Sequence, residues 1–260
     1  MSCAIDARGL TYRYPDGHAA LAGIDLHVAH GERVAVLGPN GAGKTTFMLH
    51  LNGLLTASSG ELEVAGLVVE KRVLQELRAR VGLVFQDPDD QLFMPSVRED
   101  VAFGPLNMGL DRDEVRRRVD RALGAVRMQR AIDRAPHQLS QGERRRVAIA
   151  TVLAMEPRLL VLDEPSANLD PRARRELLGL LAEIDRTMLV VTHDLLFAAE
   201  LCERAVILAG GRVVADGPAD LILSDAALLA AHDLELPAGV ELSRIERRGR
   251  PVDRARAPAA

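Results

Sequence analysis

A glycine-rich segment with one lysine and two threonines carries the strongest chemical signal in the sequence. It follows an apolar run, 33–37, and opens a predicted helix, 44–55. Glycines let backbone N–H groups turn inward around phosphate oxygens, and a helix N-terminus adds partial positive charge. Lys44 can reach the outer phosphates, and the Thr45 hydroxyl can ligate magnesium. The predicted phosphate-binding residues are Gly38, Pro39, Asn40, Gly41, Ala42, Gly43, Lys44, Thr45 and Thr46.

Two carboxylates lie directly after another apolar run, 159–162, where a buried strand is expected to end. Asp163 suits the coordination shell of magnesium. Glu164 is placed to polarise or deprotonate an attacking water, because phosphoryl transfer asks the protein mainly for positioning and charge compensation. A solvated strand end without chemistry is the alternative interpretation. Beside a phosphate loop, the pair predicts a metal ligand at Asp163 and a catalytic base at Glu164.

Two further polar residues follow apolar runs. Gln86 comes after 81–85, and His193 comes shortly after 188–191. Open parallel sheets bind ligands at the carboxyl ends of their strands. Gln86 is therefore a candidate for holding the metal or the water, and His193 for touching the terminal phosphate. Taken alone, each would be interpreted as an ordinary polar residue at a strand end.

The remaining candidate metal ligands give no comparable signal. His27 and His30 lie three residues apart, with no carboxylate or third ligand beside them to complete a metal site. We expect both on the surface. Cys3 and Cys202 are the only cysteines and have no metal or redox spacing, so two free thiols and a reducing compartment are expected.

The segment Leu139-Ser-Gln-Gly-Glu143 opens a helix that is predicted to run to about Met155. Ser140 and Glu143 have the spacing of a capping box, so a helix start is the simplest interpretation. An exposed helix N-terminus with a serine hydroxyl and a glycine also suits an anion. The segment is therefore a candidate phosphate site, although the sequence alone does not say whose phosphate it would bind.

All these residues need a scaffold that brings the ends of several strands together. Short apolar runs alternate with longer amphipathic segments, which is typical of parallel strands covered by helices. Most of the runs lack polar alternation, as strands buried on both faces do. We therefore predict an α/β fold with strands at 33–37, 61–64, 81–85, 159–162 and 188–191.

An inserted helical subdomain is predicted between the third and fourth of these strands, at about 88–156. Within it, 111–130 has arginines on one face and an apolar stripe on the other, which is typical of a helix with a solvated side. The stripe consists of Val115, Val119, Ala122, Leu123 and Val126.

After the last core strand, 205–208 and 212–215 flank the pair Gly210-Gly211 and predict a hairpin. A large domain, 1–235, is then followed by a short and basic C-terminal extension, 236–260. Its last part is rich in Arg, Pro and Ala, so it is expected to fray or to form a small accessory contact.

Composition narrows the class of protein. The chain has 260 residues, 48% of them hydrophobic, and a formal net charge of −4. It can bury a sizeable core, and it has no global basic field, so no nucleic-acid partner is expected. The opening residues include charges and no uncharged apolar run reaches roughly 18 residues, so we expect neither a signal peptide nor a membrane-spanning helix.

In their order along the chain, these motifs resemble the nucleotide-binding domain of the ABC ATPases over residues 5–230. The resemblance implies an α/β P-loop NTPase of the ABC ATPase fold, with a mostly parallel core sheet, an antiparallel β subdomain and an inserted α-helical subdomain. ATP and Mg²⁺ are the implied ligands. Tyr14 resembles the aromatic residue that stacks on adenine, with Tyr12 as the alternative. The implied Mg²⁺ ligands are Thr45, Gln86 and Asp163, and the implied catalytic residues are Lys44, Gln86, Glu164 and His193.

Two chains of that family pair head to tail, and the signature segment of each, which 139–143 resembles here, closes over the ATP held by the other. Ser140 and Gly142 are thus expected to bind ATP in trans, and Asp170 to cross the dimer interface. The usual third and fifth signature residues, Gly and Gln, are here Gln141 and Glu143. We expect an active site, with the rate and the interface geometry left open by this departure.

The stretch 84–110 narrows the resemblance to the ATPases of energy-coupling-factor importers, most closely to the cobalt transport group CbiO, and 148–157 fits the same group. The resemblance implies a peripheral subunit on the cytoplasmic face of the cell membrane. Its partners would be a second ATPase subunit, a membrane T component and a substrate-binding S component. The segment 87–93 is the candidate docking surface, and a proline-marked turn with Asp89 or Asp90 capping a short helix is the alternative interpretation.

The resemblance therefore predicts an ATPase motor for cobalt uptake, with nickel, biotin or another vitamin as alternative cargoes. A homodimer and a pair with a close paralogue are both open. A soluble ABC ATPase acting on DNA or ribosomes is a distant alternative, because such proteins normally carry tandem domains, a long coiled coil or a basic surface. A GTPase or kinase is less favoured still, because the nucleotide specificity motif of GTPases is missing.

Overall fold

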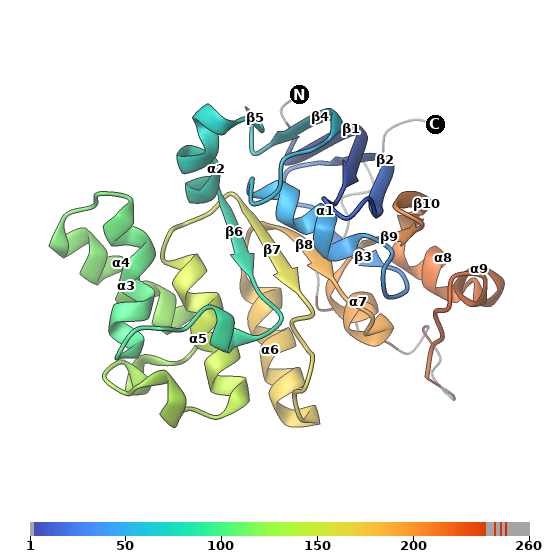
Figure 1. Cartoon of the computed structure of the whole chain (residues 1–260). Coiled ribbons are helices and arrows are strands. Elements are labelled where there is room, and N and C mark those ends of the chain that lie inside the picture. The colour runs from blue at the N-terminus through green and yellow to red at the C-terminus, as the bar shows by residue number, and fades with distance from the viewer. Residues whose placement is uncertain (1–2, 238–241, 243–244, 246–247, 249–260) are drawn as a thin grey trace.

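The computed structural model describes residues 3–237 together with 242, 245 and 248, and this part of the chain contains two sheets and the helices around them (Figure 1). In the larger sheet the strand order is β10-β9-β3-β8-β7-β6, and every pairing from β9 to β6 is parallel. β10 pairs antiparallel with β9. The predicted mostly parallel core sheet is therefore confirmed. Its strands are β3 (Arg33–Leu37), β6 (Val81–Val84), β7 (Leu159–Asp163), β8 (Thr187–Val191), β9 (Arg204–Ala209) and β10 (Arg212–Pro218).

The smaller sheet is antiparallel, with the order β2-β1-β4-β5. Its strands are β1 (Ile5–Arg13), β2 (Ala19–Val28), β4 (Ser59–Val64) and β5 (Leu67–Val68). The assignment of 61–64 to the parallel set was wrong, because this segment belongs to β4. Only one face of β4 is covered: Leu62 and Val64 are buried, whereas Glu61 is exposed and Glu63 half-buried. This alternation is the pattern of an antiparallel strand with one solvated face.

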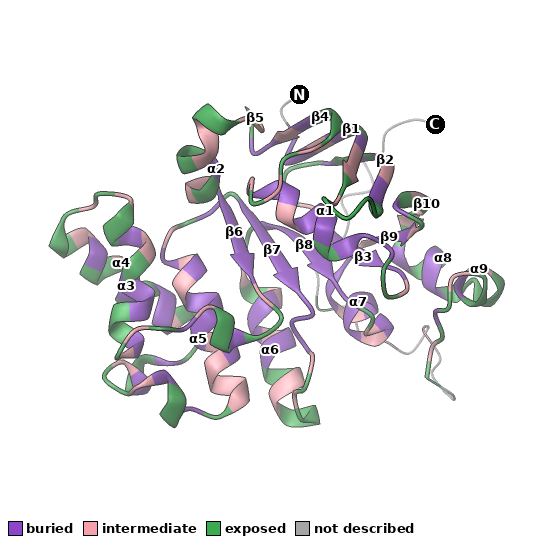
Figure 2. Ribbon diagram, viewed as in Figure 1, coloured by how far each residue is buried: buried purple, intermediate pink, exposed green. Residues whose placement is uncertain are grey.

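The parallel strands of the larger sheet are buried on both faces, whereas the antiparallel edge strand β10 is not (Figure 2). In β3, Val34 and Val36 belong to one hydrophobic cluster, which contains residues of α1 (Lys44–Leu51). Ala35 and Leu37 belong to the other, which contains residues of α6 (Pro171–Glu183) and α7 (Leu195–Leu201). The sheet is thus a rigid layer between two cores, and polar side chains are confined to its ends.

Three longer helices lie beyond the β6 edge of the sheet (Figure 1). They are α3 (Val97–Asn107), α4 (Arg112–Ala125) and α5 (Gln141–Leu153). Ser96, Asp111 and Ser140 cap their N-termini through side-chain oxygens that accept backbone N–H groups. The predicted stripe on α4 faces inward, since Val115, Val119, Ala122, Leu123 and Val126 are all buried.

Apart from α6, which has 13 residues, the other helices are short. α1 begins at Lys44 as predicted but ends at Leu51, four residues before the predicted end. Gly53 follows with a positive φ of 67°, a conformation that stops a helix and suits glycine. The remaining helices are α2 (Leu74–Arg80), α8 (Ala219–Ser224) and α9 (Ala226–Ala230), with 3₁₀ turns at Lys71–Val73, Pro88–Asp90, Gln129–Ala131 and Pro136–Gln138.

The predicted hairpin after the core strands is present, with Gly210 and Gly211 between β9 and β10. Most of the predicted C-terminal extension, 236–260, lies outside the described residues. Within the part that is described, Leu242 and Ile245 pack against the core, and the Arg248 N–H donates to the Glu200 carbonyl at 2.9 Å. None of the helices in the described part of the chain is both long enough and apolar enough to cross a membrane.

Gly82, in the middle of β6, has no room for a side chain. A Cβ atom there would lie 2.0 Å from Cγ1 of Val152 and 3.1 Å from Cγ of Pro157. Valine in a helix has one strongly preferred rotamer, so Val152 on α5 cannot simply turn away. We expect Gly82→Ala to lower the free energy of unfolding by roughly 1–3 kcal/mol, measured by urea denaturation.

Gly124→Ala on α4 is the matched control for this substitution. The nearest atom to its added Cβ would be Nε2 of Gln129, at 3.5 Å. Alanine in an open helix interior should raise stability by roughly 0.5–1 kcal/mol relative to glycine. A Gly82→Ala protein as stable as the wild type would contradict the packing described between β6 and α5.

Candidate functional site

The phosphate loop links the end of β3 to the start of α1. Gly38 has a φ of 143° and Gly43 a φ of 98°, both in the region that favours glycine. A Cβ atom at Gly38 would lie 2.1 Å from the Leu208 carbonyl oxygen, and one at Gly43 would lie 2.5 Å from the Ala20 carbonyl oxygen. The two glycines are therefore required by backbone that passes close to the loop from both sheets.

An open cavity of about 210 Å³ lies against this loop. It brings together residues from the loop, from the segment after β6, from the β7 end and from the segment between β1 and β2. Its lining consists of Tyr14, His18, Ala20, Asn40, Gly41, Ala42, Gly43, Lys44, Thr45, Thr46, Gln86, Asp163 and Glu164. Gly38 and Pro39 do not line it, but their carbonyl oxygens accept from Lys44 Nζ at 2.7 and 2.9 Å.

Lys44 is buried at the base of this cavity. Burial lowers the pKa of its ammonium group, while the charges of Glu164 and Asp163 act in the opposite direction. Its two hydrogen bonds to loop carbonyls use two of its three N–H donors. A phosphate oxygen in the cavity is the kind of acceptor that would complete this set.

Asp163 ends β7 on the other side of the cavity and is 6% exposed. Burial, and then the neighbouring charge of Glu164, raise the pKa of Asp163 to about 6, against the lowering effects of Lys44, Arg145 and a hydrogen bond from Thr45. The carboxylate is thus held in a site that disfavours its ionised form. A divalent cation would reverse that balance, and the oxygen donors of Thr45, Gln86 and Asp163 are the ligand type that Mg²⁺ prefers.

Glu164 is held in place by the segment that follows β8. Its Oε2 accepts from Oγ1 of Thr192 at 3.0 Å and from the His193 N–H at 3.3 Å, and its Oε1 lies 2.8 Å from Nδ1 of His193. Glu164 also has a φ of 43°, which is strained for a residue with a side chain. Each carboxylate oxygen has two lone pairs, so Oε1 retains capacity for a further donor such as water.

His193 does not line the cavity itself. Its side chain is 71% exposed and contacts the site through Glu164. The predicted contact of His193 with a terminal phosphate stays a prediction.

Tyr14 rather than Tyr12 faces the cavity. Its hydroxyl lies 3.0 Å from Oγ1 of Thr46, and its ring stacks on His18 at a centroid distance of 6.4 Å and an angle of 19°. Tyr12 instead packs edge-on against His50 and Tyr14. His18 was not predicted as a site residue, because no spacing rule in the sequence connects it to the phosphate loop.

Gln86 lies in the cavity lining at the exit from β6, where the backbone of Phe85 is held from two sides. Nη1 of the fully buried Arg145 donates to the Phe85 carbonyl at 2.8 Å, and the Phe85 N–H donates to Oε1 of Gln91 at 3.2 Å. Gln91 also donates through Nε2 to the Ala148 carbonyl at 2.8 Å. Gln91 therefore points inward and joins the exit of β6 to α5.

The signature segment lies apart from this cavity within the same chain. Neither Ser140 nor Gly142 lines it, and the exposed Ser140 caps α5. The Ser140 hydroxyl and the Ser140 N–H both lie 2.8 Å from Oε2 of Glu143, which completes the predicted capping box. Asp170 is likewise exposed and caps α6 through the N–H groups of Arg172 and Ala173. Of the three residues predicted to act across an interface, Ser140 and Asp170 are exposed and Gly142 is half-buried, and none of them lines the phosphate-loop cavity of its own chain.

Asp194 is a further residue that the sequence reasoning missed. Its carboxylate accepts from Oγ of Ser166 at 3.1 Å, from Nε of Arg174 at 2.9 Å and from the Phe197 N–H at 2.9 Å. Burial alone would raise the pKa of Asp194. The hydrogen bonds from Arg174, Phe197 and Ser166, together with the charge of Arg174, hold it below its ordinary value. The acid thus connects the loop after Glu164 to the segment of His193. Its position directly after His193 was the one available signal.

Comparison with known families matches residues 21–167 to the family described as ABC transporter. The energy-coupling factor transporter ATP-binding protein EcfA of Methanothermobacter thermautotrophicus is 48% identical over 255 residues, covering 96% of this chain and 82% of that protein. CbiO1 of Clostridium perfringens, described as part of the ABC transporter complex cbiONQ, is 39% identical with a TM-score of 0.80, covering 91% of this chain and 97% of that chain.

A solved dimer of the ATP-binding cassette MJ0796, in a post-hydrolysis state with ADP and Pi, is also similar. It is 28% identical with a TM-score of 0.73, and the match covers 83% of this chain and 98% of that chain. The similar structures match most of this chain. The family match, 21–167, includes every residue that lines the cavity except Tyr14, His18 and Ala20.

The raised pKa of Asp163 predicts that this residue destabilises the nucleotide-free chain at neutral pH. Because its pKa is about 6 in the folded state against an ordinary 3.8, its stabilising contribution is complete below a pH of about 4 and is lost as the pH rises through about 6. Asp163→Asn should therefore raise the free energy of unfolding at pH 8 by roughly 1–3 kcal/mol, with no gain at pH 4. Urea denaturation at both pH values measures the difference.

The same substitution should weaken Mg²⁺-dependent nucleotide binding, because it removes the charged ligand. Asp120→Asn, at an exposed position on α4, is the control and should leave both quantities unchanged. Equal stability gains for Asp163→Asn at pH 4 and pH 8 would rule out the electrostatic explanation.

Proposed function

This chain belongs to the ABC transporter family of ATP-binding proteins, and on that premise we propose that it is the ATP-hydrolysing motor of an energy-coupling-factor importer. It would act as a peripheral subunit on the cytoplasmic face of a membrane, coupled to a T component and a substrate-binding S component. The similarity to EcfA and to CbiO1 over most of the chain supports this transporter class.

The observation that carries the proposal is the division of the site into two separate parts. One part is the cavity with Lys44, Asp163 and Glu164, and the other is the exposed end of α5 with Ser140 and Gly142. Since the second part does not line the phosphate-loop cavity within the described part of its own chain, we infer that it serves a second ATPase subunit. The similar ATP-binding cassette MJ0796 is dimeric in its structure with ADP and Pi, which supports a paired arrangement.

Glu164 is the group that would accept a proton from the attacking water. The His193 and Thr192 hydrogen bonds fix its carboxylate, so the base does not have to be oriented during the reaction. Lys44 and the loop N–H groups would hold the outer phosphates. When bound, Mg²⁺ would offset the negative charge on the transferred phosphoryl group, held by Thr45, Gln86 and Asp163.

The docking surface that we propose for the membrane partner extends the segment 87–93 onto α3. Phe93 and Phe103 are 63% and 40% exposed and pack edge-on at a centroid distance of 5.0 Å. Leu106, one turn along α3, is 53% exposed. Exposed aromatic pairs of this kind commonly mark interfaces. Gln91 lies within this segment, but we do not include it in the proposed surface because its side chain points inward.

Cobalt ion is the cargo that we propose, on the similarity to CbiO1. Nickel, biotin or another vitamin are the alternatives, because the ATPase subunit does not itself hold the cargo. Transport of labelled candidates by the complex that co-purifies with this chain would distinguish them. The same co-purification shows whether the second ATPase subunit is another copy or a paralogue.

Glu164→Gln tests the assignment of the base. The amide keeps the size of the side chain but cannot take a proton, so ATP turnover should fall by roughly 10²–10⁴-fold while ATP binding persists. ATP-dependent dimers should accumulate and are measured by size-exclusion chromatography. Glu183→Gln, at a surface carboxylate on α6, is the control; turnover by Glu164→Gln near the control's would refute the assignment.

Paired substitution of Phe93 and Phe103 by alanine tests the docking surface. Loss of the two exposed phenylalanine rings should reduce the amount of membrane T component that co-purifies with this chain roughly tenfold. ATP hydrolysis by the isolated chain should stay at the wild-type rate. Leu221→Ala is the matched control, because Leu221 is 64% exposed on α8, at the opposite end of the molecule from α3 (Figure 1). Unchanged co-purification would eliminate this surface.

A further inference from the structure

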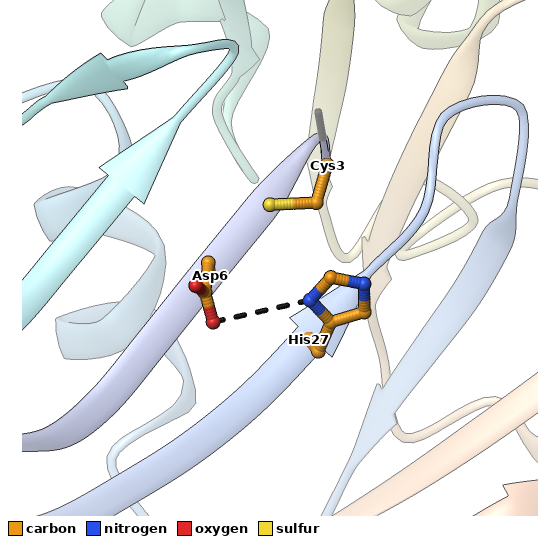
Figure 3. Close-up of side chains that lie close together, drawn as sticks. All are labelled: Cys3, Asp6 and His27. Atoms are coloured by element: carbon orange, nitrogen blue, oxygen red, sulfur yellow. Dashed lines mark ion pairs between the residues drawn. The ribbon is translucent and has the colours of Figure 1, made fainter. Parts of the chain in front are cut away.

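Three potential metal ligands of different chemistry converge on the antiparallel sheet, away from the nucleotide cavity. Asp6 on β1 and His27 on β2 are directly paired across the two strands. Oδ1 of Asp6 lies 3.9 Å from Nδ1 of His27. Sγ of Cys3, just before β1, completes a group whose three ligand atoms all lie within 4.8 Å of one another (Figure 3).

The pleat of the sheet explains why these side chains meet. Asp6 lies between the buried residues Ile5 and Ala7, so its side chain points to the outer face of β1. His27 is exposed between two buried residues of β2 and points to the same face. The expectation that His27 has no carboxylate or third ligand was therefore wrong, because strand pairing supplies both from the N-terminal segment.

The charges around the group favour a cation. Glu63 on β4 is paired with Asp6 from the other side, so two carboxylates flank the thiol. Arg8 is the opposing charge; its guanidinium holds Oδ2 of Asp6 at 2.5 Å and leaves Oδ1 facing His27. Burial, and then the charges of Asp6 and Glu63, raise the pKa of the Cys3 thiol. A bound cation would offset this penalty and displace the thiol proton.

We propose that Cys3, Asp6 and His27 form a binding site for a divalent transition-metal ion of the zinc and cobalt type. Thiolate and imidazole select such borderline ions over Mg²⁺, which prefers oxygen ligands. Metal–ligand bonds of about 2.0–2.3 Å require the donors to close to within roughly 3.5 Å of one another. The His27 side chain is 61% exposed and free to make this movement. A water would complete a tetrahedral site.

An ion at this position would join the start of β1 to the end of β2. The opposite ends of these two strands lead to Tyr14 and Ala20, which line the nucleotide cavity. The ion would therefore brace the sheet against which the phosphate loop packs. Its binding stabilises the fold by mass action and does not depend on the identity of the transporter.

Titration of the untagged, reduced chain with Co²⁺ tests the proposal, in excess Mg²⁺ and without nucleotide. We expect one equivalent to bind, with the near-ultraviolet charge-transfer absorption of a cobalt thiolate and a rise in Tm. Cys3→Ser should abolish the absorption, and His27→Gln should weaken binding at least tenfold. His30→Gln, three residues along the chain from His27, is the matched control and should bind as the wild type does.

The pH dependence gives a second readout. Co²⁺ affinity should fall as the pH is lowered from 8 to 6, because binding of the ion displaces the proton of the Cys3 thiol. The charged groups that face the site are Asp6, Arg8, His27, Glu61 and Glu63, and none of the substitutions above removes a carboxylate. Absence of a one-equivalent site in the wild type, or equal binding by Cys3→Ser, His27→Gln and the control, would overturn the proposal.

Discussion

Burial of both faces of the parallel sheet is the constraint from which the rest of the structure follows. Val34 and Val36 of β3 pack into one core while Ala35 and Leu37 pack into the other, so the strand has no position for an unpaired polar group. Polar side chains are therefore confined to the ends of the strands: Arg33 and Thr187 lie at amino ends, and the residues of the nucleotide site lie at carboxyl ends. The carboxyl ends lie on one edge because the strands are parallel, and the phosphate loop, Gln86, Asp163, Glu164 and His193 gather there.

Gathering these groups has an electrostatic cost. Burial lowers the pKa of Lys44 and raises that of Asp163, and Glu164 adds a second negative charge beside Asp163. The site is thus organised for charges that its own residues do not supply. A magnesium-bound triphosphate would supply a cation to the carboxylates and anions to the lysine. Its binding would therefore offset this electrostatic cost and stabilise the fold.

Features encoded by local spacing could be predicted from the sequence, and features that depend on pairing between distant segments could not. The phosphate loop, the capping box at Ser140 and the buried stripe of α4 each occupy one short segment. By contrast, the antiparallel pairing of β4 and the approach of Asp6 to His27 depend on strand register, which no single segment specifies. The inward side chain of Gln91 depends likewise on α5, far along the chain.

Glu143 stands where the signature usually has glutamine, and the effect of this change depends on the residues around it. Its carboxylate accepts the N–H and the hydroxyl of Ser140, and chiefly the backbone bond keeps the pKa of Glu143 below its ordinary value, so the group is ionised. In the proposed dimer this charge would face the partner's triphosphate. Arg134 lies 3.8 Å from the carboxylate, and Arg146 also acts on it. Because two arginines from the same region offset the charge, the substitution by itself does not predict an inactive site; instead, dimer closure must compete with Glu143 for the Ser140 hydroxyl.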